Sequence, residues 1–385
     1  MSITLILLTV FWFLIILSFL VFIHELGHFL AAKLVGVFVE EFGLGYPPRL
    51  RRLFQWRGTV FTLNALPFGG FVRLYGDESE NLEGSQTEET DSVNELVSQH
   101  RISDSAKFAS KSIGQRLLVL LAGITVNFLF GALAFAYIYS RIGIPTPTGK
   151  VEVTEVLADS PAQKAGFQVG DQIIQAQGEQ SSKFTTSNQF IYFISQHQGE
   201  NVKVVLQREA QEQVTEVYIR RQDEIGPNQG AIGILLSDNE LKFYPWWEMP
   251  FRGMWIGFQE AFGLALLIVD ALKQMIVNLF MRGTVPKDVS GFVGIVDQAV
   301  QVEAVKQGFL SNLNTAALLS INLAIMNLLP IPALDGGRAM FVLAEPLLGK
   351  NRRARWEQKA NTVGFVFLLG LIVLITIKDV LGIIL

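Results

Sequence analysis

Long uninterrupted runs of apolar residues dominate this chain. The first run holds 21 uncharged residues, from Ile3 to Ile23. A helix rises about 1.5 Å per residue, so about 20 such residues cross a hydrocarbon core of about 30 Å. We therefore expect transmembrane helices at 1–37, 113–140, 309–335 and 361–384. The pattern predicts a polytopic α-helical membrane protein with about four transmembrane helices.

After the first predicted helix, apolar and polar residues begin to alternate. Within 38–76, residues 59–76 alternate roughly between apolar and polar, and Pro67, Gly69 and Gly70 interrupt them. This pattern is typical of a hairpin or bent strand pair. Because unpaired backbone is penalised in lipid, a membrane-associated β-hairpin must pair with itself, with the protein or with a substrate strand. The alternative is a small amphipathic hairpin with only a structural role.

Polar segments separate the other apolar runs. Residues 77–112 begin with a cluster of acidic side chains and predict a solvated polar linker to which we assign no chemistry. Residues 148–237 contain strand-like pieces on either side of a short helix, with Ser160 as its N-cap and Gly166 at its end. This spacing predicts an inserted α+β domain. The stretch from Asp159 to Ile174 also resembles a PDZ domain, whose open sheet edge binds an added peptide strand.

Two further segments are less regular. Residues 245–282 are apolar in bulk, but polar side chains recur every few positions, and Trp246, Trp247 and Trp255 fit interfacial anchoring. We favour an amphipathic interfacial helix there, with a further membrane span as the alternative. The glycines within 290–295 indicate a turn.

Composition agrees with a membrane protein and limits its chemistry. Half of the residues are hydrophobic and 17% are charged, which is too apolar for an ordinary soluble protein of this length. A net charge of −4 does not favour binding to nucleic acid. The absence of cysteine excludes disulfides and thiolate metal sites, so any zinc must be held by His, Asp or Glu. The N-terminus lacks the basic region of a cleavable signal, so we expect the first span to be retained.

The strongest candidate chemistry lies late in the first span, where Glu25 stands between His24 and His28. Helical positions four apart share a face, so both imidazoles can bind one metal while Glu25 takes a proton from the attacking water. Polar groups at such a depth usually mark a working site. The alternative is a chance match on surface histidines, but the whole chain holds only four histidines.

A catalytic zinc needs a third protein ligand. Asp335 follows a segment that Pro330 and Pro332 prevent from continuing as a regular helix, so its carboxylate can lie on an unwound turn near membrane depth. An N-cap role for Asp335 in the next helix is an equally good interpretation of the spacing. Asn127, in the second predicted span, favours an interhelical hydrogen bond over catalysis.

Basic residues predict the topology. They cluster at Arg49–Arg57 and Arg338–Lys359, two loops that four crossings place on the same side. Such loops stay in the cytoplasm, whereas the 141–250 segment is acidic. We expect an inner-membrane protein with an active site that opens to the cytoplasm, and with both termini and the PDZ-like domain outside.

Several motifs together resemble the site-2 protease family, and the arrangement is similar to the bacterial regulator-of-sigma-E protease branch. The motifs are the His24–His28 segment, Pro67–Val72, Asn127, the PDZ-like insertion and Asn327–Gly336. The resemblance implies a Zn²⁺ ion held by His24, His28 and Asp335, with Glu25 as general base. It also implies that substrate binds the hairpin residues Pro67, Phe68, Gly69 and Gly70, and that Asn322 and Asn327 steady its extended backbone. Only one PDZ-like module is present, and the acidic linker matches no family feature.

These features together predict a zinc-dependent intramembrane endopeptidase. Its substrates would be single-span membrane proteins, such as anti-sigma factors or remnant signal peptides, with a peptide or substrate terminus bound at the PDZ-like domain. Two alternatives belong to other classes. One is a PDZ-bearing membrane scaffold with a structural metal site. The other is a metal transporter, which would need more intramembrane ligands than this chain offers.

Overall fold

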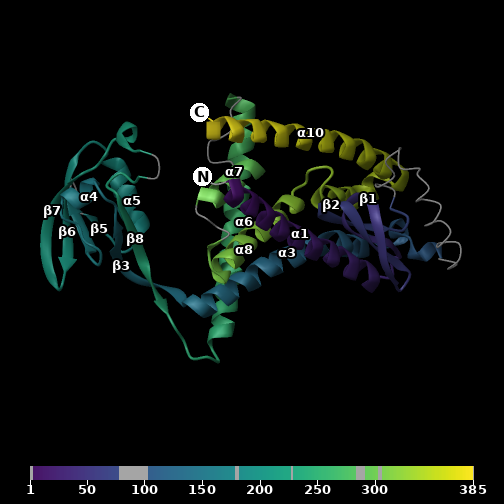
Figure 1. The fold of residues 1–385 in the computed structure, drawn as a ribbon, viewed down its shortest axis with the longest axis horizontal. Coiled ribbons are helices and arrows are strands. Elements are labelled where there is room, and N and C mark those ends of the chain that lie inside the picture. The colour runs from purple at the N-terminus through teal and green to yellow at the C-terminus, as the bar shows by residue number, and fades with distance from the viewer. Residues whose placement is uncertain are drawn as a thin grey trace. The chain divides into compact units, whose positions relative to one another are not determined.

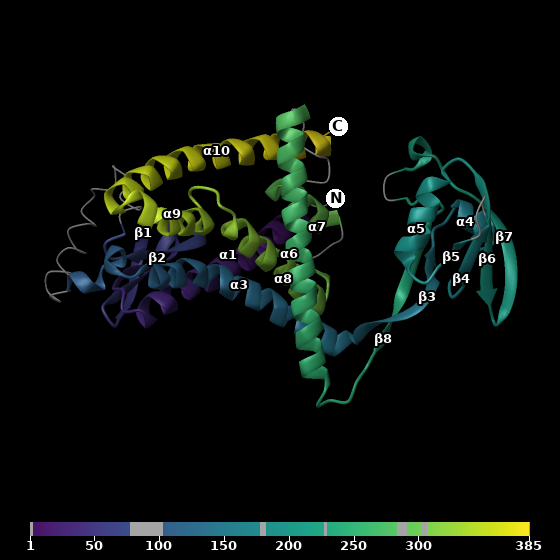
Figure 2. The same cartoon turned by 180° about the vertical axis from the view of Figure 1, so that it is seen from behind.

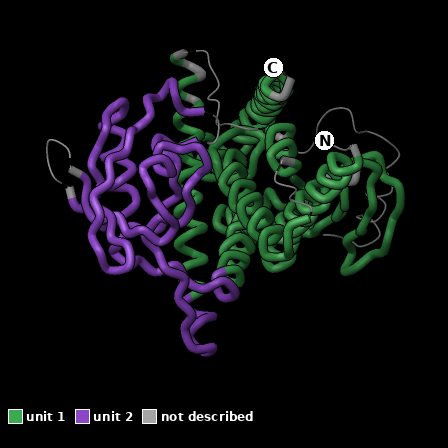
Figure 3. The backbone as a smooth tube through the Cα atoms, turned by 60° about the vertical axis from the view of Figure 1, so that its left-hand side comes forward, with its two compact units in different colours: residues 1–138, 253–385 green, residues 139–252 purple. Residues whose placement is uncertain are grey.

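The structure is a computed structural model that describes residues 3–77, 103–177, 182–226, 229–282, 291–301 and 306–384. Two compact units make up the chain, one of residues 1–138 and 253–385 and the other of residues 139–252 (Figure 3). The second unit is thus inserted into the first. Most of the acidic residues of the predicted linker lie outside the described residues.

The first unit is mainly helical, and the sheet β1–β2 lies at one end of it (Figure 1). Among the described residues, five helices are long and apolar enough to cross a membrane. These five are α1 (Ile3–Leu34), α3 (Ile113–Ile142), α6 (Met249–Arg282), α8 (Phe309–Leu328) and α10 (Lys350–Ile384). Two shorter α-helices, α7 (Phe292–Gln301) and α9 (Asp335–Leu348), accompany them. These elements agree with the predicted polytopic membrane protein.

Helices α1 and α3 cross at very short range (Figures 1 and 2). A Cβ atom added to Gly27 of α1 would lie 2.8 Å from the backbone oxygen of Ala122 and 3.0 Å from the Cα of Gly123, both on α3. Only glycine permits this approach, because any side chain at residue 27 would collide with the α3 backbone. The crossing places the second half of α1 directly against α3.

The predicted hairpin is a strongly irregular antiparallel pair, β1 (Val39–Trp56) and β2 (Thr59–Leu74). Both strands bend back on themselves, so four segments pair in the order 70–74, 39–44, 59–64 and 49–56. Phe42, Val72 and Leu74 are buried in a core that also contains Phe29 of α1 and Val119 of α3. This core fixes the segment 70–74, at one edge of the described sheet, to the membrane helices.

The second unit is an α+β domain with its own core. Its sheet has the order β7-β6-β4-β3-β8, with β5 paired to β4. The elements are β3 (Ile144–Val156), α4 (Pro161–Lys164), β4 (Gln172–Gln177), β5 (Ser182–Lys183), α5 (Ser187–Gln196), β6 (Asn201–Arg208), β7 (Gln211–Tyr218), η3 (Gln222–Glu224) and β8 (Ile234–Lys242). Ser160 caps α4 as predicted, since its Oγ accepts the N–H of Gln163 at 3.1 Å. Strand β8 forms one end of the sheet and β7 the other.

The prediction of a turn at 290–295 is wrong for its described part. Residues Phe292–Gln301 form α7, because tertiary contacts stabilise a glycine-containing segment that is a poor helix former alone. The carboxylate of Asp379 on α10 accepts the N–H groups of Gly291 and Gly294 at 2.8 and 2.9 Å. Val296 and Val300 pack against Phe13 of α1.

The prediction of a loop at Arg338–Lys359 is also wrong. These residues belong to α9 and to the start of α10, separated only by Gly349. Arg338 and Arg353 form ion pairs with carboxylates of the protein instead of extending into solvent. The amphipathic pattern of this segment is helical, and its buried face carries charge as well as apolar residues.

Two predicted segments differ in detail from the structure. The end of the 77–112 linker contains two short 3₁₀ helices, η1 (Asp104–Ala106) and η2 (Phe108–Ser110), and Phe108 is buried in the first unit. Residues 245–282 contain the single long helix α6, in which Gly257 packs closely on the α3 backbone at Ala132. The interfacial placement of α6 stays a prediction.

Candidate metal centre

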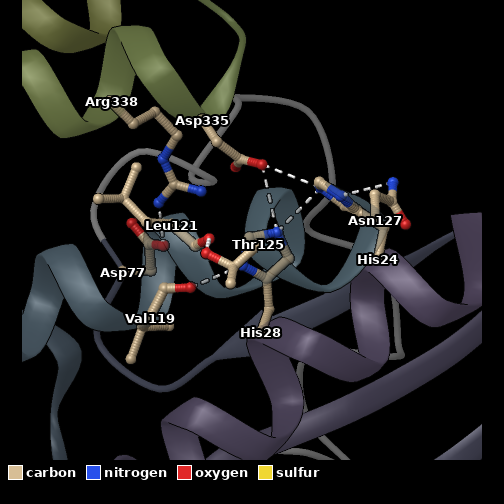
Figure 4. Close-up of polar contacts among 9 residues, drawn as sticks. All are labelled: His24, His28, Asp77, Val119, Leu121, Thr125, Asn127, Asp335 and Arg338. Atoms are coloured by element: carbon tan, nitrogen blue, oxygen red, sulfur yellow. Dashed lines mark hydrogen bonds and ion pairs between the residues drawn. The ribbon is translucent and has the colours of Figure 1, made fainter. Parts of the chain in front are cut away.

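Three side chains from two distant parts of the sequence converge in the first unit (Figure 4). The Nε2 atoms of His24 and His28 lie 3.1 Å apart on one face of α1. The Oδ2 atom of Asp335 lies 3.0 Å from Nε2 of His24 and 3.2 Å from Nε2 of His28. Both histidines are buried. The sequence predicted this set of three residues, and the structure brings all of them together.

The spacing of these atoms fits a tetrahedral zinc ion. Zinc binds histidine nitrogen and carboxylate oxygen at about 2.0–2.2 Å, which separates neighbouring ligand atoms by about 3.3–3.5 Å. The three distances between ligand atoms are 3.0, 3.1 and 3.2 Å. Three protein ligands leave the fourth position of a tetrahedral zinc for solvent or substrate, as catalytic sites require.

Helix α3 fixes the ring orientation of both histidines. The Nδ1–H of His28 donates to the backbone oxygen of Val119 at 2.8 Å. The amide nitrogen of Asn127, Nδ2, lies 3.2 Å from Nδ1 of His24, while Oδ1 of Asn127 is buried without a hydrogen bond. A 180° flip of this amide exchanges the two atoms and satisfies both groups, because Oδ1 then accepts the Nδ1–H of His24. The contact with Val119, and the contact with the flipped Asn127 amide, each select the tautomer that leaves the Nε2 lone pair for a metal. Asn127 therefore makes the predicted interhelical contact, and that contact ends on a candidate metal ligand.

Gly123 of α3 allows the two imidazoles to lie against the helix backbone. A Cβ atom at this position would lie 2.5 Å from Nε2 of His28 and 2.9 Å from Nε2 of His24. These are the same two nitrogens that face Asp335. The glycine thus leaves the space in which the three candidate ligand atoms meet.

Asp335 enters the site from the start of α9. Leu334 holds the N-cap position and Asp335 is the first helical residue, so the N-cap role that we weighed for Asp335 is not observed. The preceding turn has Ala333 at a φ of 76°, and the N–H of Ala333 donates to the side chain of Asn361 on α10 at 3.0 Å. Gly336 follows, where a Cβ atom would collide with the backbone oxygen of Leu328. The break after α8 therefore aims the carboxylate at α1.

Glu25 is half-buried beside the two histidines and next to the hairpin. An added Cβ atom on Gly70 would lie 3.5 Å from Cγ of Glu25 and 4.0 Å from Cγ1 of Val21. The edge segment 70–74 therefore reaches the candidate general base.

The other predicted site residues lie outside the three-residue cluster. Pro67, Phe68 and Gly69 belong to β2, as predicted for the hairpin, and Gly69 is tightly packed on Tyr46. Asn322 is exposed and Asn327 is half-buried on α8. Their roles in binding substrate stay predictions.

Sequence reasoning missed two kinds of contact. One is the backbone oxygen of Val119, which no side-chain pattern could indicate. The other is Arg338, one helical turn after Asp335, which pairs with Asp77 at the end of the hairpin (Figure 4). The spacing of Asp335 and Arg338 on one helix face was the available signal.

Several known proteins are similar in sequence to this chain. Residues 12–371 match the sequence model of peptidase family M50. A protein of Clostridium perfringens, provisionally named a zinc metalloprotease, is 32% identical over 94% of this chain and 96% of its own length. The zinc metalloprotease RasP of Geobacillus kaustophilus is 28% identical over 96% of each chain. The PDZ domain of the SdrC-like protein from Listeria monocytogenes is 24% identical, with a TM-score of 0.20, over 25% of this chain and 95% of that domain.

Proposed function

The chain belongs to peptidase family M50, and we propose that His24, His28 and Asp335 hold its zinc ion while Glu25 is its general base. It is a site-2 type zinc metalloprotease of the bacterial inner membrane, as the family and the named relatives show. When bound, zinc supplies a Lewis acid that polarises the scissile carbonyl and makes an attacking water more acidic. The convergence of three ligand atoms within 3.2 Å of one another carries the assignment.

Glu25 performs the proton transfers in this proposal. Its carboxylate accepts a proton from the attacking water and later delivers that proton to the nitrogen of the leaving amine. Two observations support this role. Glu25 is the single acidic residue of α1, and it lies against Gly70 at the sheet edge. A substrate strand at that edge brings its carbonyl within reach of the same carboxylate.

The substrate must expose its backbone before hydrolysis. A transmembrane helix has its backbone hydrogen bonds satisfied internally, so the segment to be cut has to unwind. The edge segment 70–74 of the hairpin then supplies strand-type hydrogen bonds to the opened chain. We accordingly propose single-span membrane proteins with helix-weakening residues as substrates, for example anti-sigma factors or remnant signal peptides already trimmed on the outer side.

The inserted domain selects substrates in this proposal. We assign it the role of a filter for the size or terminus of a substrate, on the outer side of the membrane, with the active site opening to the cytoplasm. A sharp test removes residues 144–242, because Ile144 and Lys242 are paired neighbours in β3 and β8 and the cut ends can be rejoined directly. We expect the shortened protein to cleave full-length and trimmed substrates equally. Retained discrimination between them would contradict the filter.

The test of the enzymatic assignment compares wild type with Glu25→Gln in purified form on a tagged single-span substrate. Glu25→Gln keeps the size of the side chain and removes the base, so cleavage should fall about 10²- to 10⁴-fold while one zinc per chain is retained. A chelator should abolish wild-type cleavage, and added zinc should restore it. Full activity of Glu25→Gln would contradict the proposal and favour the alternative, a PDZ-bearing scaffold with a structural metal.

A further inference from the structure

A continuous row of charged side chains, buried except for the half-buried Arg338, lies in the first unit. It alternates in sign and ties four parts of the chain together: the end of the hairpin, α3, α9 and α10. Its ion pairs join Asp77 to Arg338, Arg338 to Glu357, Glu357 to Arg353, Arg353 to Glu345 and Glu345 to Arg116. The function proposed above uses none of these six residues.

The strongest link in this row joins α3 to α9. Arg116 donates from Nη1 to Oε2 of Glu345 at 2.6 Å and from Nη2 to Oε1 at 2.8 Å. Arg116 is 2% exposed and Glu345 is 7% exposed. The hydrogen bonds from Arg116, with the charges of Arg116 and Arg353, hold the pKa of the Glu345 carboxyl below its usual range. Such a two-point contact fixes both the distance and the angle between its partners.

The two helices that the Arg116–Glu345 pair joins both contact the candidate metal centre. Helix α3 already holds His28 through the Val119 oxygen and His24 through Asn127. Asp335 is the first residue of α9, the same helix that carries Glu345. One pair of side chains thus connects the helix that orients both histidines to the helix that presents the third candidate ligand.

Energetics favour a geometric role for the pair over a purely stabilising one. Two charges lose their hydration on burial, and replacing a buried ion pair with apolar residues of similar volume is often neutral or stabilising. Removing one partner alone leaves an uncompensated buried charge and is strongly destabilising. A pair that adds little net stability but fixes two helices at one register suits a site in which three ligand atoms must meet.

We propose that Arg116 and Glu345 are positioning residues for the zinc site. Their two-point contact sets the register of α9 against α3, so that Oδ2 of Asp335 meets the Nε2 atoms of His24 and His28. The inference rests on the proposed zinc site. Loss of the pair leaves the fold in place and allows Asp335 to move relative to the histidines, which weakens zinc binding and lowers kcat more than it changes KM.

The test uses the full-length protein and the double variant Arg116→Met with Glu345→Met, which removes both charges and retains similar volume. Zinc affinity is measured by competition with a chromophoric chelator, site geometry by the visible absorption of the Co²⁺ form, and stability by thermal unfolding. We expect a cooperative unfolding transition, a zinc affinity reduced about 10- to 100-fold, as for other residues that orient metal ligands, and a shifted Co²⁺ spectrum.

A second variant and a matched control make the result decisive. Arg116→Lys keeps the charge but loses the two-point geometry, and it should also weaken zinc binding. The control is Arg208→Met with Asp171→Leu, which removes a two-point pair with distances of 2.7 Å from the other unit and should leave zinc affinity unchanged. Wild-type zinc affinity and Co²⁺ spectrum in Arg116→Lys, or in a folded double-Met variant, would overturn the inference. Failure of wild type itself to bind zinc would instead refute the proposed zinc site.

Discussion

The Nδ1 atom of His28 lies 2.8 Å from the backbone oxygen of Val119, so a main-chain group of α3 determines the tautomer of a candidate metal ligand on α1. A backbone oxygen cannot be removed by substitution. The contact therefore depends on how closely the two helices approach. That approach is set by Gly27, which lies directly against the α3 backbone, and by Gly123, which leaves room for the two imidazoles.

Gly123→Ala should abolish zinc binding. The added methyl group would lie 2.5 Å from Nε2 of His28, well inside van der Waals contact, and must displace a ligand. Zinc content after gel filtration measures the loss. Gly114→Ala is the matched control on the same helix, because a Cβ atom there meets nothing within 4 Å. That variant should bind zinc normally and gain about 0.4–1 kcal/mol of stability. Stoichiometric zinc in Gly123→Ala would contradict the geometry described for the site.

Asn127→Ala should weaken zinc binding without destroying the fold. The substitution frees Nδ1 of His24 and lets the ring choose the other tautomer, which typically costs about 10- to 100-fold in metal affinity. Chelator competition gives the value directly. Thr125→Val is the control two residues away, since the Thr125 hydroxyl donates only within its own helix, to the Leu121 oxygen at 2.8 Å. Equal affinities in the two variants would exclude an orienting role for Asn127.

The edge of the hairpin should contact substrate. The chain contains no cysteine, so single cysteines can be introduced without background. In a Glu25→Gln protein, Gly70→Cys should form a disulfide with a cysteine placed near the scissile bond of a single-span substrate. Phe54→Cys lies in the segment 49–56 at the opposite edge of the sheet and should not. Gel mobility under non-reducing conditions measures both. Preferential cross-linking at residue 54 would contradict the assignment of the binding edge.

Acid should destabilise the inserted domain through Asp171. Burial raises the pKa of this carboxyl, but hydrogen bonds from Arg208 and from the Gln168 N–H outweigh it and hold the pKa below the ordinary value of 3.8. A depressed folded-state pKa adds stability that is complete above the unfolded-state pKa and is lost as pH falls through the folded-state value. Wild type should therefore unfold at a higher temperature than Asp171→Asn at pH 6. The difference should shrink below about pH 4. A constant difference down to pH 2 would contradict the ion-pair explanation.

The sequence predicted the parts of this site that depend on local spacing. His24 and His28 are separated by one helical turn, so their common face followed from helix geometry alone. Asp335 was left between two roles by spacing, and only the resemblance to site-2 proteases favoured ligation. The structure resolves the N-cap question because Leu334 takes that position. The approach of α9 to α1 depends on tertiary packing, which local pattern does not encode.

Ion pairs between residues far apart in the sequence were the main feature that the hydrophobic and polar pattern could not predict. Arg338 and Arg353 were counted as residues of a basic loop. Arg338 instead pairs with Asp77, which is far away in the sequence, and Arg353 pairs with Glu357, one helical turn later. Glu345 and Arg116 are 229 residues apart in sequence, and nothing near either one indicates its partner. Helix α7 was missed for the same reason, since its start is capped by Asp379 from the last helix.

The most direct test of the central claim is zinc K-edge X-ray absorption of the purified full-length protein. We predict two imidazole nitrogens at about 2.0–2.1 Å and oxygen ligands at about 2.0–2.2 Å, in a site with one zinc per chain, and the loss of stoichiometric zinc in Asp335→Ala. Stoichiometric zinc in Asp335→Ala with an unchanged spectrum would contradict the account.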